Sequence, residues 1–230
     1  LGDVYKRQKI VDRYESKKSN EDLFIMSISM QNHGGYTEKY DNFDEKARML
    51  GINYPDVNQY LSLIHESDSA LEYLISYFEK VDDPVEIVFF GDHQPSLSSS
   101  FYPYLNGKGL GGLTLSELEN LYTVPFFIWT NYDSGKESVE LTSLNYLSTL
   151  ALERAGIALP AYNQFLADMM EEIPAVNSRG FYSKSQGKFL HVEDAAGEDA
   201  KWLKNYEILQ YNNMFDKRNK SELFFPYLKQ

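Results

Sequence analysis

Three short apolar runs, each bounded by turn-forming or polar residues, predict buried β-strands in this chain of 230 residues. They cover residues 23–30, 85–90 and 124–129, and they are rich in β-branched and aromatic side chains. Apolar runs of this length are typical of strands in a parallel sheet whose faces are both covered. Between the first two runs, apolar residues recur at helical spacing over residues 58–78, which predicts an amphipathic helix.

The order of strand, helix and strand predicts a βαβ unit, whose right-handed crossover brings the carboxyl ends of both strands to one edge of the sheet. Asp56 or Asn58 is expected to cap the start of the helix. Further helices are expected between residues 142 and 156, at 161–170 and at 199–214, with a small hairpin between the last two. The pattern therefore predicts an α/β fold.

Side chains that can bind a metal follow two of the predicted strands. Asp92 and His93 come directly after Gly91, where one strand ends, and His33 stands in a two-glycine loop after another. Ligands of open α/β sheets bind beyond the carboxyl ends of strands, and a carboxylate with imidazoles suits a divalent ion. The same residues are also compatible with a plain turn and exposed histidines. Phosphoryl or sulfuryl transfer would need more acidic ligands and a nucleophile, and no Ser or Thr clearly faces the trio.

Composition excludes several functions. The formal net charge is −12 and no run of Lys or Arg is long enough to bind nucleic acid. The absence of Cys excludes disulfides, thiolate metal sites and a Cys nucleophile. The longest apolar runs fall far short of the ~20 residues of a membrane-spanning helix. His65 lies off the apolar stripe of its helix and is expected in solvent, and His191 is expected to be structural or exposed.

Three motifs lie at the predicted strands: MQNHGGY at 30–36, FFGDHQP at 89–95 and VPFFIW at 124–129. In this order and approximate spacing they resemble the C-terminal half of the lipoteichoic acid synthase family, over roughly residues 22–215. That family consists of sulfatase-like phosphoglycerol transferases of the alkaline phosphatase superfamily. The resemblance implies an alkaline-phosphatase-like fold with a central, mostly parallel sheet flanked by helices, of which the N-terminal part is missing here.

The resemblance also implies a role for each strand-end residue. Asp92 and His93 match two of the four metal ligands, the metal being Mn²⁺ or another divalent ion, Mg²⁺ or Zn²⁺. His33 matches a histidine that contacts the phosphoglycerol head group of the substrate. The other two ligands, a Glu and the nucleophilic Thr, match no residue of this chain, because they lie further towards the N-terminus in the family.

The implied enzyme takes glycerophosphate from a phosphatidylglycerol-type lipid and passes it to a glycerophosphate or glycan acceptor during synthesis of cell-envelope polymers. It would work at the extracytoplasmic face of the bacterial cell membrane, which it would contact through N-terminal helices missing from this chain. The fragment alone is expected to be inactive. Other interpretations stay open: a phosphoethanolamine transferase or a sulfatase of the same superfamily, or a non-catalytic cell-surface binding domain.

The sequence does not begin with Met, and its first residues do not resemble a signal peptide. Residues 3–8 read DVYKRQ, which a common sequencing-library adapter encodes when it is translated in frame. We predict that residues 1–8 derive from an adapter ahead of a truncated reading frame; the alternative is a genuine charged segment. Residues 9–172 are then predicted to belong to the catalytic domain, and 173–230 to form a hairpin and helix that pack on it.

Overall fold

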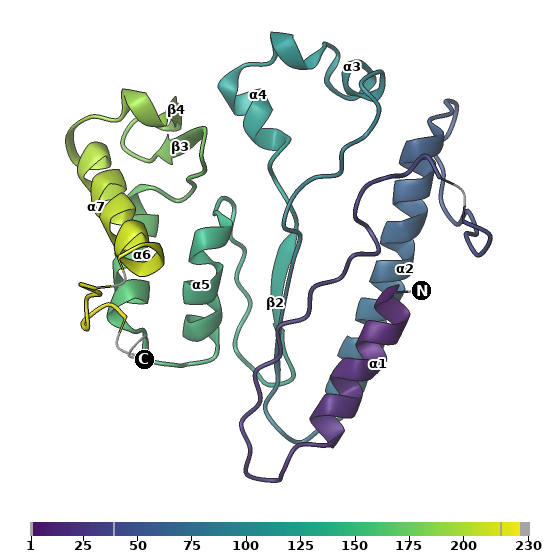
Figure 1. The fold of residues 1–230 in the computed structure, drawn as a ribbon, viewed down its shortest axis with the longest axis horizontal. Coiled ribbons are helices and arrows are strands. Elements are labelled where there is room, and N and C mark those ends of the chain that lie inside the picture. The colour runs from purple at the N-terminus through teal and green to yellow at the C-terminus, as the bar shows by residue number, and fades with distance from the viewer. Residues whose placement is uncertain (1, 39, 217, 226–230) are drawn as a thin grey trace. The chain divides into compact units, whose positions relative to one another are not determined.

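The structure is a computed structural model that describes residues 2–38, 40–216 and 218–225. The chain forms two compact units (Figure 1). The first comprises Leu1–Val85 with His93–Gly112, and the second comprises Glu86–Asp92 with Leu113–Gln230. Within the described ranges, no helix combines the length and the apolar composition needed to cross a membrane.

Two packed helices form the centre of the first unit. They are α1 (Gly2–Glu15) and α2 (Pro55–Phe78), which lie side by side in Figure 1. The ring of Tyr14 on α1 meets the ring of Phe78 on α2 edge-on, with centroids 5.2 Å apart. Aromatic pairs of this geometry contribute beyond the apolar area that they bury. Two short segments complete the unit: α3 (Phe101–Asn106) and the 3-10 turn η1 (Leu110–Gly112).

Helix α2 begins earlier than predicted, with Pro55 in its first turn. Proline is favoured there because its fixed φ suits the helix and its missing N–H would have no partner anyway. The expectation that Asp56 or Asn58 caps the helix is wrong, since the capping position has no side-chain hydrogen bond. These two side chains accept hydrogen bonds from backbone N–H groups of neighbouring loops instead. His65 is exposed, as predicted.

The segment at 23–30 is not the strand that its composition predicts. Its apolar side chains are largely exposed, Phe24 by 91% and Met26 by 71%. A strand is stable only where its backbone N–H and C=O groups pair with a neighbour. Each sheet of the described residues has two strands, and neither includes this segment. The predicted βαβ unit is therefore not formed.

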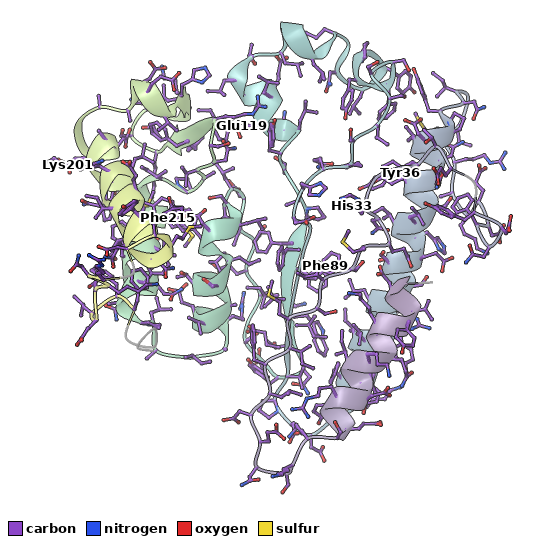
Figure 2. All side chains as sticks on the ribbon, viewed as in Figure 1. His33, Tyr36, Phe89, Glu119, Lys201 and Phe215 are labelled. Atoms are coloured by element: carbon purple, nitrogen blue, oxygen red, sulfur yellow. The ribbon has the colours of Figure 1, made fainter. Side chains whose placement is uncertain are left out.

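The other two predicted strands are present in the second unit, as β1 (Glu86–Phe90) and β2 (Phe126–Thr130). Phe89, labelled in Figure 2, lies opposite Phe127, and their stacked rings have centroids 5.3 Å apart. The mixed α/β class is confirmed, but the expected parallel pairing is wrong for the described sheets, which are antiparallel. The chain between β1 and β2 leaves the C-terminal end of β1 and enters β2 beside that same end, where Gly91 N–H donates to the Pro125 carbonyl. Two neighbouring strands joined in this way run antiparallel.

Three helices and a hairpin enclose the hydrophobic core of the second unit. Tyr146, Leu166, Met169, Ile173 and Phe181 are at most 1% exposed. The structure confirms the hairpin and the helices expected near 142–156, at 161–170 and at 199–214. The remaining elements are α4 (Leu115–Asn120), η2 (Leu144–Tyr146), α5 (Leu147–Arg154), α6 (Ala161–Glu172), β3 (Gly180–Ser183), β4 (Lys188–His191), η3 (Val192–Asp194) and α7 (Gly197–Met214).

Helix α1 includes residues 2–8, which we predict to derive from an adapter. A helical conformation does not bear on the origin of a segment. The adapter origin and the domain boundaries after residues 8 and 172 therefore stay predictions.

Candidate functional site

The loop that carries His33 is held against helix α2 by hydrogen bonds. Asn32 Nδ2 donates to Ser67 Oγ on α2 at 2.9 Å, and the Tyr36 hydroxyl donates to the Asn32 carbonyl at 2.5 Å. Tyr36, labelled in Figure 2, is 4% exposed. Its ring lies edge-on to that of Tyr60 on α2, with centroids 5.5 Å apart. These contacts hold in place the backbone from which the His33 side chain projects.

Burial changes the acidity of Tyr36. The loss of water around the phenol, with a smaller effect of nearby Tyr60, raises the pKa of Tyr36 to about 12. Burial acts in this direction because it disfavours the charged phenolate. Tyr36 therefore remains a hydrogen-bond donor at physiological pH. The His33 side chain is exposed and accessible to a ligand.

Asp92 follows the C-terminal end of β1, where glycine allows a close approach of the backbone. The Gly91 N–H donates to the Pro125 carbonyl at 3.0 Å, which extends the pairing of β1 with the start of β2. A Cβ atom on Gly91 would lie only 3.2 Å from Val124 Cβ, closer than ordinary van der Waals contact. This packing fixes the peptide that precedes Asp92, whose side chain is exposed.

His93 belongs to the same unit as His33. Its Nδ1 lies 2.9 Å from the Gln94 carbonyl oxygen. Because a carbonyl oxygen only accepts, Nδ1 is the donor in this hydrogen bond. The rings of His33 and His93 lie edge to face with centroids 6.1 Å apart. The structure thus brings two of the predicted site residues together, while the roles of all three stay predictions.

The donors suit a divalent ion in kind but not in number. A carboxylate, as in Asp92, and an imidazole, as in His93, are both ordinary ligand types of Mn²⁺, Mg²⁺ or Zn²⁺ sites. In the part of the chain that the structure describes, no group of three or more His, Asp or Glu residues could hold a metal ion. These residues therefore supply at most part of a catalytic metal site.

Sequence reasoning identified His33 but not the residues that hold its loop. Asn32 and Ser67 are 35 positions apart, and Tyr36, which bonds back to Asn32, is packed on Tyr60 of α2. The available signal was Ser67 itself, a polar residue on an otherwise apolar helix stripe. A partly buried hydroxyl in such a place needs a hydrogen-bond partner.

Comparisons with known proteins extend this picture. The family model described as Sulfatase matches residues 5–157. A Rhizobium meliloti (strain 1021) protein named for cyclic beta-1,2-glucan modification is 23% identical over 219 residues, which cover 92% of this chain and 34% of that protein. The capsular polysaccharide biosynthesis protein RkpI of the same strain is 33% identical over 104 residues, 45% of this chain and 18% of RkpI.

A solved structure shares the fold. The Streptococcus pyogenes phosphoglycerol transferase GacH, in complex with sn-glycerol-1-phosphate, matches with a TM-score of 0.61 at 19% identity. The match covers 90% of this chain and 48% of that chain, so this chain spans about half of GacH and about a third of the glucan-modification relative. The family model covers well over half of the present sequence. The chain belongs to the sulfatase family.

Proposed function

We propose that this chain is the C-terminal portion of a metal-dependent phosphoglycerol transferase that acts on a phosphatidylglycerol-type lipid in the synthesis of cell-envelope glycerophosphate polymers. The observation that carries the proposal is the pair of His33 and His93, whose rings lie 6.1 Å apart in a chain of the sulfatase family. His93 is joined to Asp92 in a Gly-Asp-His sequence at the end of a strand.

Asp92 and His93 would hold the metal, which we propose to be Mn²⁺, with Mg²⁺ or Zn²⁺ as alternatives. An ion bound there supplies a Lewis acid that polarises a phosphoryl oxygen. The hydrogen bond of His93 Nδ1 to the Gln94 carbonyl supports this role, because metal-binding histidines commonly donate one ring N–H to a backbone carbonyl. The nucleophilic Thr and a Glu ligand are proposed to lie outside this chain, which spans only 48% of the matched GacH structure.

His33 would bind the phosphoglycerol head group. Its imidazole is exposed and can donate a hydrogen bond to a phosphate oxygen or to a glycerol hydroxyl. The bonds of Asn32 and Tyr36 hold the loop against α2 before substrate arrives. A loop that is already ordered loses less conformational entropy on binding, so more of the contact energy remains as affinity.

The proposed donor is a phosphatidylglycerol-type lipid. The nucleophile would displace diacylglycerol from the phosphorus, and a hydroxyl of a glycan or glycerophosphate acceptor would then take up the glycerophosphate and release the nucleophile. The relatives' names concern glucan and capsular polysaccharide, and GacH is a phosphoglycerol transferase with sn-glycerol-1-phosphate bound, which supports this substrate class. We place the reaction at the extracytoplasmic face of the membrane, with membrane contact through helices outside this chain.

The four histidines of the chain provide a direct test. Mn²⁺ is paramagnetic and broadens the NMR signals of nearby protons, so it can be titrated into the chain while the imidazole signals are followed. We expect His93 and His33 to broaden at about tenfold lower Mn²⁺ concentration than the exposed His65 and His191. Asp92→Asn removes a charged ligand at constant size and should raise that concentration about tenfold.

The head group is tested by adding sn-glycerol-1-phosphate, phosphoethanolamine or sulfate, each with diamagnetic Mg²⁺ so that the His33 signals stay sharp. We expect sn-glycerol-1-phosphate, but neither of the other two compounds, to shift the His33 signals. His33→Gln should abolish this binding while Mn²⁺ still broadens His93. Equal broadening of all four histidines, unchanged in Asp92→Asn, would refute the metal site, and a response to sulfate alone would indicate a sulfatase. Without its nucleophile, the chain should release no diacylglycerol from phosphatidylglycerol.

A further inference from the structure

An open cavity of about 580 Å³ lies in the first unit, where a loop meets the N-terminal end of α2. Its volume falls within the range of about 300–1,000 Å³ typical of small-molecule sites. Four polar and two apolar side chains line most of it: Glu45, Arg48, Asn53, Asn58, Met49 and Ile52.

Buried side chains of α2 hold the loop of this cavity in place. Asn58, which is 5% exposed, accepts a hydrogen bond from the Met49 N–H at 2.9 Å. The hydroxyl of Ser62, which is 1% exposed, accepts from the N–H groups of Lys46 at 3.0 Å and Ala47 at 3.1 Å. The loop has neither helix nor strand, yet it is anchored at several points. A ligand therefore meets a cavity that is already formed, which lowers the entropic cost of binding.

The polar groups of the cavity favour a neutral polyol over an ion. Arg48 Nη2 lies 2.9 Å from Glu45 Oε1, and this ion pair carries no net charge. They still offer N–H donors and carboxylate acceptors, and the Asn53 amide offers both. Sugar hydroxyls both donate and accept hydrogen bonds, and the C–H face of a sugar ring can pack on apolar side chains such as Met49 and Ile52.

The same helix holds both this cavity and the His33 loop. Asn58 lines the cavity, Ser67 binds the His33 loop through Asn32, and between them Gln59 donates to the Glu38 carbonyl at 3.1 Å. At about 1.5 Å rise per residue, residues 58 and 67 are separated by roughly 14 Å along the helix axis. Such a separation suits a polymeric acceptor that is bound through one sugar residue while another sugar residue reacts.

We propose that this cavity is an acceptor subsite that binds a sugar unit of an envelope glycan. The inference rests on the proposed function, because it takes the acceptor to be a glycan. It adds a specificity-determining site that lies apart from Asp92 and His93 in the sequence and has different chemistry.

The probe is a linear β-1,2-linked gluco-oligosaccharide, and the readout is the backbone amide NMR spectrum of the chain. We expect saturable shifts within residues 45–53, with a Kd on the order of 1 mM. Arg48→Ala removes charge-assisted donors and should weaken binding about tenfold. The matched control is Arg13→Ala, which breaks a comparable exposed ion pair with Glu21 at 3.0 Å and should leave the Kd unchanged.

The outcomes separate this inference from the proposed function. Absence of saturable shifts in residues 45–53, or equal weakening by Arg48→Ala and Arg13→Ala, overturns the subsite, even if Mn²⁺ still broadens His93. Selective sugar binding in a chain whose His93 shows no Mn²⁺ response supports a sugar site in this cavity and refutes the metal site of the proposed function. Arg48→Ala should lose sugar affinity and keep the Mn²⁺ response, because Arg48 is not part of the proposed metal site.

Discussion

Replacing Tyr36 by Phe tests whether one hydroxyl holds the His33 loop. The substitution keeps the packing on Tyr60, with ring centroids 5.5 Å apart, and removes only the bond to the Asn32 carbonyl at 2.5 Å. A neutral hydrogen bond contributes about 1 kcal/mol net, and a partly buried carbonyl left without a partner costs about 1 kcal/mol more. We therefore expect the free energy of unfolding to fall by about 1–2 kcal/mol.

Urea denaturation measures this loss, which should lower the midpoint without changing the slope. The control is Tyr60→Phe, because no hydrogen bond of the Tyr60 hydroxyl is found among the described residues; we expect a change below about 0.5 kcal/mol. In Tyr36→Phe the His33 signals should also shift and the affinity for sn-glycerol-1-phosphate should fall. Equal destabilisation by both substitutions would refute the anchoring role of the Tyr36 hydroxyl.

The raised pKa of Tyr36 gives this prediction a pH dependence. The phenol has a pKa of about 12 in the folded chain and about 10 when exposed, so folding favours its neutral form. Its contribution to stability is complete below pH 10 and is lost as the pH rises towards 12. The wild type should therefore lose more stability than Tyr36→Phe between about pH 10 and 12. Parallel stability curves for the two proteins would contradict the pKa shift.

Three further substitutions test contacts within the second unit and the exposed apolar segment of the first. Gly91→Ala places a methyl group 3.2 Å from Val124 Cβ and should cost about 1–3 kcal/mol of unfolding free energy, measured by urea denaturation. Tyr146→Phe leaves the buried Ile173 carbonyl without the hydroxyl that lies 2.6 Å away and should cost about 1–3 kcal/mol in the same assay, whereas a loss below 0.5 kcal/mol would contradict this hydrogen bond. Met26→Lys replaces a side chain that is 71% exposed and should reduce concentration-dependent self-association in sedimentation velocity while stability changes by less than about 0.5 kcal/mol.

Local patterns predicted most elements of the fold. The helices α2, α6 and α7 repeat apolar residues at helical spacing, and β1 and β2 are short β-branched and aromatic runs, so each element lies close to its predicted position. The segment at 23–30 is an apolar run like those strands, but it pairs with neither of them. Strand formation depends on a partner, and composition does not reveal whether one is present.

The candidate site divides in the same way. The Gly-Asp-His sequence at 91–93 and the histidine loop at 30–36 can be recognised from the sequence, because turn residues and potential ligands after apolar runs form a local pattern. Their roles as metal ligands and head-group contact stay predictions. The anchoring of the loop could not be predicted, because the bond from Asn32 to Ser67 joins residues 35 positions apart, and no local pattern specifies such a pair.

The sequence by itself determined the types of most elements, the candidate site residues Asp92, His93 and His33, and the sulfatase-type resemblance that the family match confirms. The tertiary structure decided which of these side chains meet. It brought the rings of His33 and His93 within 6.1 Å, paired β1 and β2 antiparallel, and formed the cavity at the start of α2. The reason is physical: backbone preference is set by neighbours along the chain, whereas contacts between distant residues depend on how helices and loops pack.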